Sequence, residues 1–269
     1  MRAGAERAHS LTTSDGVVLQ ARLAAPTHPS GVLVLCHGLS TDCDEHGAFP
    51  ALRDLALRSG LAVVRFDFRA HGQSSGANAD LRLAGLRRDV DAVSELIDDQ
   101  LGGELPVVPV GVSFGGAAAV HLADTRPSCA GLVLWYAVID YGRNFGPDSS
   151  VAFTAQMRAA VSEADPEWSA MPVLGTRYHL PAGLIEELAN DPTPARLSAL
   201  PLPVLAYYGS RDPLVDVEPV QRLAAERDDV ELRIAHGASH GFVLWRPWVL
   251  RQTVRWAARA VRGELSRSP

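Results

Sequence analysis

One short stretch, Gly-Val-Ser-Phe-Gly at residues 111–115, constrains the fold more than any other part of this sequence. An apolar run (107–110) precedes it and small residues (116–120) follow it, so the pattern predicts a buried strand, a sharp turn and a helix. In such a turn the serine backbone is strained, and neighbouring segments of the backbone pass so close that only glycine fits at Gly111 and Gly115. A serine hydroxyl reacts as a nucleophile beside a base, so the stretch predicts Ser113 as a nucleophile. The alternative is a chance Gly-x-Ser-x-Gly in a glycine-rich chain.

Apolar runs alternate with helical patterns along most of the chain. This alternation predicts an α/β fold with a mostly parallel sheet covered by helices on both faces. Such a sheet binds ligands beyond the carboxyl ends of its strands. The expected buried strands cover 31–36, 61–66, 106–112, 132–135, 204–208 and 230–235, and an antiparallel pair covers 10–13 and 17–24. The expected helices end near 58, run from a cap at Asp80 to 100, cover 219–226 and close the chain between 245 and 262.

The alternation stops between residues 141 and 200. This region is rich in proline, and 151–164 and 182–189 are its best helical segments. We expect a helical lid inserted into a single α/β domain that spans 1–269. A separate small helical domain is the alternative.

Composition excludes several classes of function. The chain has 269 residues, a formal net charge of −6 and no lysine. The acidic balance argues against nucleic acid or an anionic membrane as partner, and the lack of lysine excludes Schiff-base chemistry on this chain. We expect no membrane span and no signal peptide. Three irregularly spaced cysteines, Cys36, Cys43 and Cys129, fit unpaired thiols in a cytoplasmic protein, although a Cys36–Cys43 disulfide is an alternative.

A serine nucleophile needs a histidine base, and the base needs a carboxylate that orients it. For a nucleophile on this type of turn, the chain order is serine, acid, histidine. Asp212 and His240 fit this order, and each follows a predicted buried strand. We therefore predict Ser113 as nucleophile, His240 as general base and then acid, and Asp212 as the residue that orients the imidazole.

Other acidic and histidine side chains compete for these roles. Asp140 and Asp216 are alternative acids, although the start of a helix is the more ordinary role of Asp216. His236 is an alternative base because it lies closer to the end of its strand.

Acyl transfer also requires two N–H donors for the oxyanion of the tetrahedral intermediate. We predict that the backbone of Phe114, directly after the nucleophile, supplies one. Leu39, in the loop after the first buried strand, is placed to supply the other, and Gly38 lets that loop approach closely. His37 is then structural, as a partner of a loop carbonyl, and an ordinary His-Gly turn is the alternative.

Several motifs, taken together and in order, resemble the α/β-hydrolases. Among them the chain is most similar to small, lid-bearing serine hydrolases, which include carboxylesterases, feruloyl-type esterases, and monoglyceride-lipase-like and serine-aminopeptidase-like members. The resemblance implies that Asp67, Arg69 and His71 brace the loops around the site, and it says little about the substrate. The matching stretches are 36–39, 67–74, 111–116, 209–215 and 237–242.

The expected reaction is hydrolysis of a carboxylic ester or thioester of a small acyl substrate through an acyl-enzyme. Acyl transfer or cyclisation, peptide cleavage and a non-catalytic binding role are alternatives, and the intact serine, acid and histidine argue against the last. We expect an apolar acyl pocket, with core packing as the alternative for each of its aromatic residues. The candidate pocket residues are Trp135, Tyr136, Tyr141, Trp168, Met171 and Tyr178.

We expect no cofactor and no metal. Asp42, Asp44, Glu45, His46 and His71 are a conceivable ligand set, but their spacing matches no known metal pattern. The oligomeric state is open, and a homodimer is one option.

Overall fold

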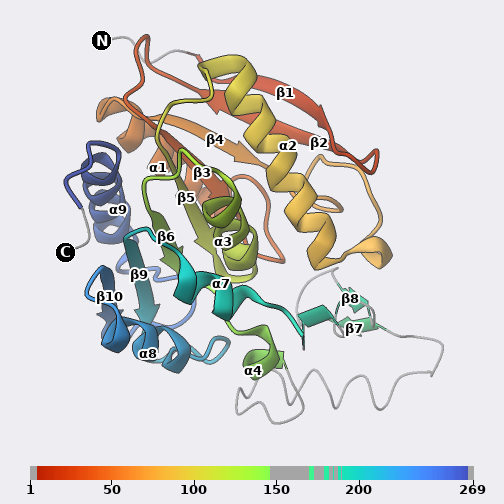
Figure 1. The fold of residues 1–269 in the computed structure, drawn as a ribbon. Helices are drawn as coiled ribbons and strands as arrows, with labels where there is room; N and C mark the ends of the chain where they lie inside the picture. Colours follow the sequence, from red (N-terminus) through yellow and green to blue (C-terminus); the bar gives the residue numbers. More distant parts are fainter. Residues whose placement is uncertain are drawn as a thin grey trace.

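An eight-stranded sheet forms the centre of the computed structural model, in the order β1-β2-β4-β3-β5-β6-β9-β10 (Figure 1). The structure describes residues 5–145, 170–172, 179–181, 184, 187–188 and 190–265. β1 and β2 form an antiparallel pair, β2 runs antiparallel to β4, and the remaining neighbours are parallel, which confirms the predicted α/β class. The strands are β1 Arg7–Thr12, β2 Val18–Ala24, β3 Val32–Cys36, β4 Ala62–Phe66, β5 Val107–Val112, β6 Leu132–Trp135, β9 Val204–Gly209 and β10 Val230–Ala235.

Helices cover both faces of the sheet. α2 (Leu83–Leu101), α3 (Gly116–Thr125) and α8 (Glu218–Glu226) lie on one face, and α1 (Ala48–Arg58) and α9 (Arg246–Val261) lie on the other (Figure 1). In β3, Val32 and Val34 enter the first core while Leu33 and Leu35 enter the second. Burial on both faces is why these strands are continuous apolar runs rather than alternating ones.

The start of α2 differs from its prediction. Asp80 ends a short 3₁₀ turn, Asn78–Asp80, and the N-cap position of α2 is held by Arg82, whose backbone is extended. The free N–H of Leu83, in the first turn, donates instead to the carboxylate of Glu187 at 2.6 Å. The capping acid therefore comes from a segment that is distant in the sequence.

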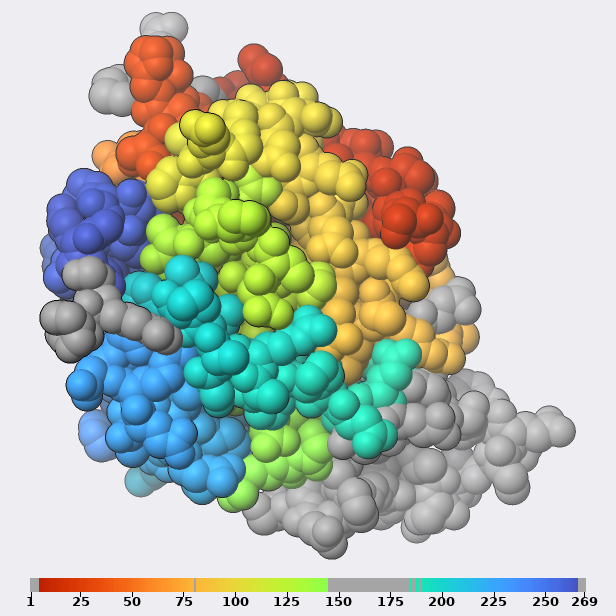
Figure 2. Space-filling view, viewed as in Figure 1, coloured from red at the N-terminus to blue at the C-terminus, as the bar shows by residue number. Residues whose placement is uncertain are grey.

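The segment between β6 and β9 interrupts the alternation, as expected. It contains α4 (Tyr141–Phe145), helical residues at 184, 187 and 188, and α7 (Thr193–Ala199), which packs against α3 (Figure 2). It also contains two short antiparallel strands, β7 (Ala170–Pro172) and β8 (His179–Pro181), so the prediction of helical pieces alone is wrong here. Each strand is too short to show an alternating pattern. The predicted helix over 151–164 lies outside the described residues, and the lid stays a prediction.

All three cysteines are buried and free, so the alternative Cys36–Cys43 disulfide is not formed. Burial raises the pKa of the Cys43 and Cys129 thiols to about 12 and that of Cys36 further. Among the helices that the structure describes, none is long and apolar enough to cross a membrane.

Candidate active site

The turn after β5 has the predicted strained form. Ser113 begins a short 3₁₀ turn, Ser113–Gly115, and has a φ of +49°, in the left-handed region that non-glycine residues rarely adopt. A Cβ at Gly115 would lie 2.5 Å from the carbonyl oxygens of Cys36 and His37. A Cβ at Gly111 would lie 2.8 Å from the Cβ of Ala119. The close approach of β3 and α3 therefore explains why glycine occupies both positions.

The structure brings Ser113, His240 and Asp212 together beyond the carboxyl ends of β5, β10 and β9. The Nδ1 of His240 lies 2.8 Å from Asp212 Oδ2, and its Nε2 lies 3.1 Å from the Ser113 hydroxyl oxygen. Because a carboxylate only accepts, Nδ1 carries the proton and Nε2 is left as the acceptor for the serine hydroxyl. The Asp212 side chain is 2% exposed, and its other oxygen accepts the N–H groups of Leu214 and Val215 at 2.8 and 3.2 Å.

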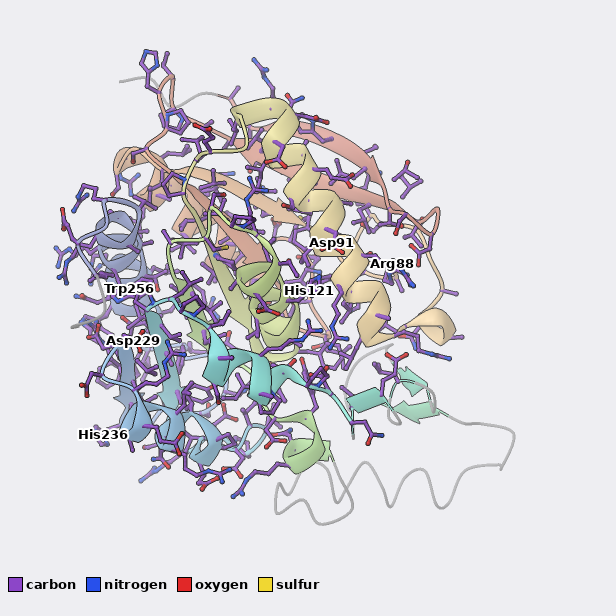
Figure 3. The ribbon with its side chains drawn as sticks, viewed as in Figure 1. Arg88, Asp91, His121, Asp229, His236 and Trp256 are labelled. Carbon is purple, nitrogen blue, oxygen red and sulfur yellow. The ribbon has the colours of Figure 1, made fainter. Side chains whose placement is uncertain are left out.

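The alternative acids and base lie elsewhere. Asp216 accepts the N–H of Glu218 at the start of α8 and pairs with Arg143, which is the ordinary role considered for it. Asp140 accepts the N–H of Arg143 at 2.8 Å. His236 is exposed beyond the end of β10 (Figure 3).

The backbone of Phe114, one predicted oxyanion donor, is oriented by main-chain bonding. The carbonyl oxygen of Ser113 accepts the N–H of Val138 at 2.9 Å. Because the C=O and N–H of a trans peptide point in opposite directions, the Phe114 N–H is turned away from Val138. Phe114 lines the same cavity as Ser113.

The backbone of Leu39, the other predicted donor, is oriented by side chains. His37 Nε2 accepts the N–H of Phe68 at 3.0 Å, so its Nδ1 carries a proton and donates it to the Gly38 carbonyl at 2.7 Å. The Leu39 N–H, in the same peptide plane, therefore points away from His37. Burial, followed by the nearby His71, lowers the pKa of His37 well below its ordinary value, so the ring stays neutral.

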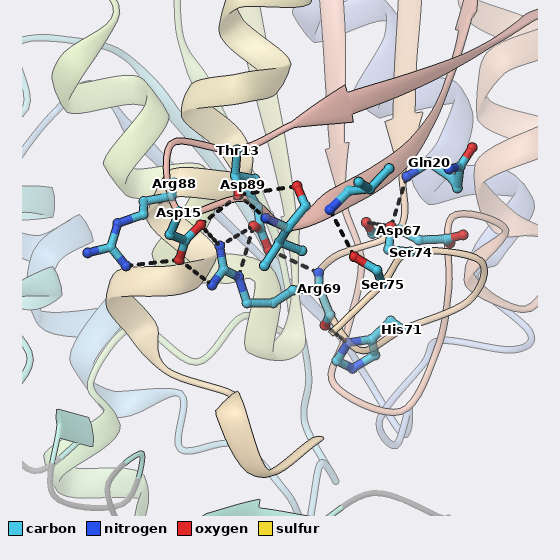
Figure 4. A network of polar contacts seen from close by, with 12 residues as sticks. Thr13, Asp15, Gln20, Asp67, Arg69, His71, Ser74, Ser75, Arg88 and Asp89 are labelled. Atoms are coloured by element: carbon cyan, nitrogen blue, oxygen red, sulfur yellow. Dashed lines mark hydrogen bonds and ion pairs between the residues drawn. The ribbon is translucent and has the colours of Figure 1, made fainter. Parts of the chain in front are cut away.

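A polar network braces the loop after β4, and the contacts match the bracing that the family resemblance implied. Arg69 bonds Asp89 on α2 at 2.9 Å and Asp15 in the β1–β2 turn at 2.8 Å (Figure 4). Asp67 accepts the N–H of Gln73 in its own loop and that of Cys43 in the loop after β3. His71 contacts the Arg69 carbonyl at 2.8 Å and the Leu39 carbonyl through its other nitrogen. The network thus reaches the backbone beside Ser113.

A cavity of about 380 Å³ lies against Ser113. Tyr136, one of the predicted pocket residues, lines it, and its ring meets the ring of His240 edge-on at 4.4 Å. Burial raises the pKa of Tyr136 well above its ordinary value. The described side chains around the cavity are those of Leu39, Ser40, Thr41, Glu45, His46, Ser113, Phe114, Tyr136, Val138, Leu214, Val215, His240, Val243 and Arg246.

Two aromatic residues predicted for this pocket do not line it. Trp135 is 2% exposed and donates its indole N–H at 3.1 Å to Thr253 on α9, across the other face of the sheet. Tyr141 is fully buried, and its hydroxyl donates to the Phe114 carbonyl at 2.5 Å. Trp168 and Tyr178 lie outside the described residues, and Met171 lies in β7, where the structure does not describe its side chain.

The sequence analysis missed the polar wall of the cavity. This wall is formed by Thr41, Glu45, His46 and Arg246. None of them belongs to a motif that indicates a binding site, and the sequence offers Glu45 and His46 only as members of a conceivable metal-ligand set. Within the described part of the chain, no three His, Cys, Asp or Glu side chains are grouped to hold a metal ion.

Comparisons with known proteins point in one direction. A model of the alpha/beta hydrolase family matches residues 33–250. A monoacylglycerol lipase of Mycolicibacterium smegmatis is 27% identical over 257 residues, covering 86% of this chain and 89% of that protein. A monoglyceride lipase of Homo sapiens is 26% identical over 258 residues, covering 86% and 82%. Est1E of Butyrivibrio proteoclasticus, solved with ferulic acid bound, shares the fold with a TM-score of 0.77 at 18% identity and covers 94% of this chain and 99% of its own.

Proposed function

The chain belongs to the α/β-hydrolase family, and from that premise we propose that it is an esterase that cleaves carboxylic esters through an acyl-enzyme on Ser113. One observation carries the proposal. An unbroken line of hydrogen bonds runs from the buried Asp212 carboxylate through His240 to the Ser113 hydroxyl, at the wall of a cavity. This arrangement has the parts that nucleophilic acyl transfer requires.

Each residue then has a defined role. His240 Nε2 takes the proton of Ser113 while the serine oxygen bonds to the ester carbonyl carbon and the carbonyl electron pair moves onto its oxygen. The N–H groups of Leu39 and Phe114 bind this oxyanion. His240 gives its proton to the leaving alcohol, and Asp212 stabilises the imidazolium meanwhile. A water molecule, deprotonated by His240, attacks the acyl-enzyme in the same way and releases the acid.

The cavity suggests an ester of modest size with an apolar acyl part. Its volume lies in the lower part of the range usual for small-molecule sites. Val138, Leu214 and Val215 offer apolar surface, while Ser40, His46 and Arg246 offer polar groups. Two of the relatives are a monoacylglycerol lipase and a monoglyceride lipase, so monoacylglycerols belong in the first substrate panel beside short and medium p-nitrophenyl esters.

The test compares wild type with Ser113→Ala and His240→Gln. We expect wild type to react with a fluorophosphonate probe, with the adduct located on Ser113 by peptide mass spectrometry, and to hydrolyse at least one ester. Ser113→Ala should lose the label and at least about 10⁴-fold in kcat. His240→Gln should fold but label far more slowly. An active Ser113→Ala, or an adduct on another serine, would refute the proposal.

A further inference from the structure

Glu45 is a buried carboxylate in the wall of the cavity beside Ser113. The residue is 5% exposed, and its Oε2 accepts the N–H of Gly38 at 2.9 Å and the hydroxyl of Thr41 at 2.6 Å. Both donors belong to the turn 38–41 that follows β3. The turn passes so close to the nucleophile that a Cβ at Gly38 would lie 3.5 Å from the Cβ of Ser113. A buried carboxylate is costly unless it is hydrogen-bonded, and here the turn supplies its partners.

The backbone around Glu45 is strained in a way that favours this position. Glu45, His46 and Gly47 have φ values of +42°, +51° and +81°. Two successive non-glycine residues in the left-handed region cost free energy and persist where surrounding contacts hold them. One such contact is the bond from Arg246 Nη1 to the His46 carbonyl at 3.0 Å. The result is a carboxylate that faces the turn 38–41 instead of solvent.

The contacts of Glu45 bear on the direction of the Leu39 N–H. Glu45 fixes the N–H of Gly38 at one end of the turn and the Thr41 hydroxyl at the other. Between them lies the Gly38–Leu39 peptide, whose carbonyl accepts from His37 and lies 3.1 Å from the Thr41 hydroxyl oxygen. The single Thr41 proton goes to the nearer, charged acceptor, which is Glu45. The groups on either side of this peptide are thus tied to one carboxylate, which limits how far the turn can change shape.

We propose that Glu45 is a positioning residue for ester hydrolysis, whose carboxylate holds the turn 38–41 so that the Leu39 N–H faces the oxyanion formed at Ser113. The inference rests on the proposed function. Glu45 acts as an acceptor for the turn and donates nothing to the reacting atoms. A negative charge this near a developing oxyanion would oppose the reaction if it were not engaged by its own donors.

The role predicts a particular pattern of kinetic effects. Removal of the acceptor disorders a group that acts in the transition state, so kcat falls while ground-state binding stays the same. Loss of a whole oxyanion donor costs about 10²–10³ in kcat, so a misaligned one should cost about 10–100-fold. Glu45→Gln keeps an oxygen that accepts from Gly38 and Thr41, and it should stay within about threefold of wild type.

The experiment uses Glu45→Ala, Glu45→Gln and the matched control Asp42→Asn, which neutralises an exposed carboxylate in the same loop that bonds the N–H of Asp44. Each protein is tested with a p-nitrophenyl ester, a trifluoromethyl ketone of the same acyl chain and an unreactive ether analogue. In the ketone adduct the Ser113 oxygen bonds to the carbonyl carbon, the carbonyl electron pair moves onto its oxygen, and the serine proton passes to His240. Fluorine NMR reports this adduct. Glu45→Met, which keeps the volume, replaces the alanine variant if that one does not fold.

We expect Glu45→Ala to lose the same factor in kcat/KM and in ketone affinity, with ether affinity within about twofold of wild type. Asp42→Asn should match wild type throughout. Equal losses for ketone and ether would show that Glu45 contacts the substrate, and a glutamine variant as poor as the alanine variant would show that its charge matters. Either result, or an unchanged Glu45→Ala, overturns the positioning role. A wild-type protein that forms no ketone adduct would instead refute the proposed function.

Discussion

The two predicted oxyanion donors lie on opposite sides of Ser113 and are oriented by different means. The Ser113–Phe114 peptide is fixed by the main chain, through Val138 and through the tight contact of Gly115 with the end of β3. The Gly38–Leu39 peptide has one long main-chain bond, from the Thr41 N–H to the Gly38 carbonyl at 3.4 Å, and its shortest contact, at 2.7 Å, comes from the His37 side chain. The Glu45 side chain holds the groups on either side of it, the Gly38 N–H and the Thr41 hydroxyl. The first donor is therefore a property of the fold, whereas the second depends on individual side chains and can be adjusted by substitution.

The largest expected effect comes from disturbing the main-chain side. Gly115→Ala places a Cβ 2.5 Å from two carbonyl oxygens, which cannot move without separating β3 from the turn at Ser113. We expect a loss of at least about 100-fold in kcat, because both donors shift, and a destabilisation of several kcal/mol. Activity per labelled site and denaturant unfolding measure the two effects. In the control Gly103→Ala, the new Cβ meets the Asp98 carboxylate at 3.1 Å, and this half-exposed side chain, paired with Arg126, is remote from the site. Activity of Gly115→Ala within tenfold of wild type would contradict the main-chain account.

A side-chain change on the other donor should have a smaller effect that can be rescued. Thr41→Val keeps the shape but removes the hydroxyl that bonds Glu45. We expect kcat to fall about tenfold, a fraction of the loss of a whole donor, and Thr41→Ser to recover most of it. Steady-state kinetics of both variants on one ester decides the point. Equal activity of the valine and serine variants would show that the hydroxyl does not orient the turn.

His37 links this side of the site to pH. Its folded pKa is lowered, first by burial, so below the ordinary histidine value of 6.5 the unfolded chain binds a proton that the folded protein excludes. Stability contributed by the neutral ring is therefore complete above that pH and is lost as pH falls, by up to about 1.4 kcal/mol per pH unit. Urea unfolding between pH 7 and 5.5 should show that the free energy of unfolding depends less steeply on pH in His37→Gln than in wild type, by the equivalent of up to one proton. Glutamine keeps one donor and one acceptor for the bonds that the imidazole makes. Identical slopes would show that His37 titrates normally.

The smallest effect should come from Tyr141→Phe. The Tyr141 hydroxyl bonds the Phe114 carbonyl, which belongs to the peptide after the one that carries the donor N–H. We expect a stability loss of about 1 kcal/mol, typical of one buried hydrogen bond, with kcat within about twofold of wild type. A large fall in kcat would mean that the main-chain side also depends on a side chain.

The sequence predicted the parts of the fold and site that repeat a local pattern. The buried strands were visible because burial on both faces makes strands such as β3 and β5 continuous apolar runs. The positions of Ser113, Asp212 and His240 followed from the ends of such runs, and their chain order from the turn type. These features need only residue type and spacing.

The features that were missed depend on contacts between distant segments. Glu187 caps α2 from 104 positions away, so the local candidate Asp80 was wrong. Trp135 and Tyr136 are neighbours at the end of β6, yet the first faces α9 and the second faces His240. Residue type and sequence position alone do not distinguish the two side chains, so both were predicted to line the pocket. Glu45 lies in a polar loop without periodicity, and only the fold brings it to Gly38.

The left-handed backbone of Ser113 has a consequence for the evolution of such a protein. A non-glycine residue held at a φ of +49° costs about 1–3 kcal/mol, and a glycine would remove that cost along with the nucleophile. If selection for catalytic activity ended, replacement of this serine by glycine would therefore increase the stability of the protein. Laboratory selection for thermal stability alone would favour the same replacement of Ser113. A search for more thermostable variants of this chain must therefore screen for turnover in every round.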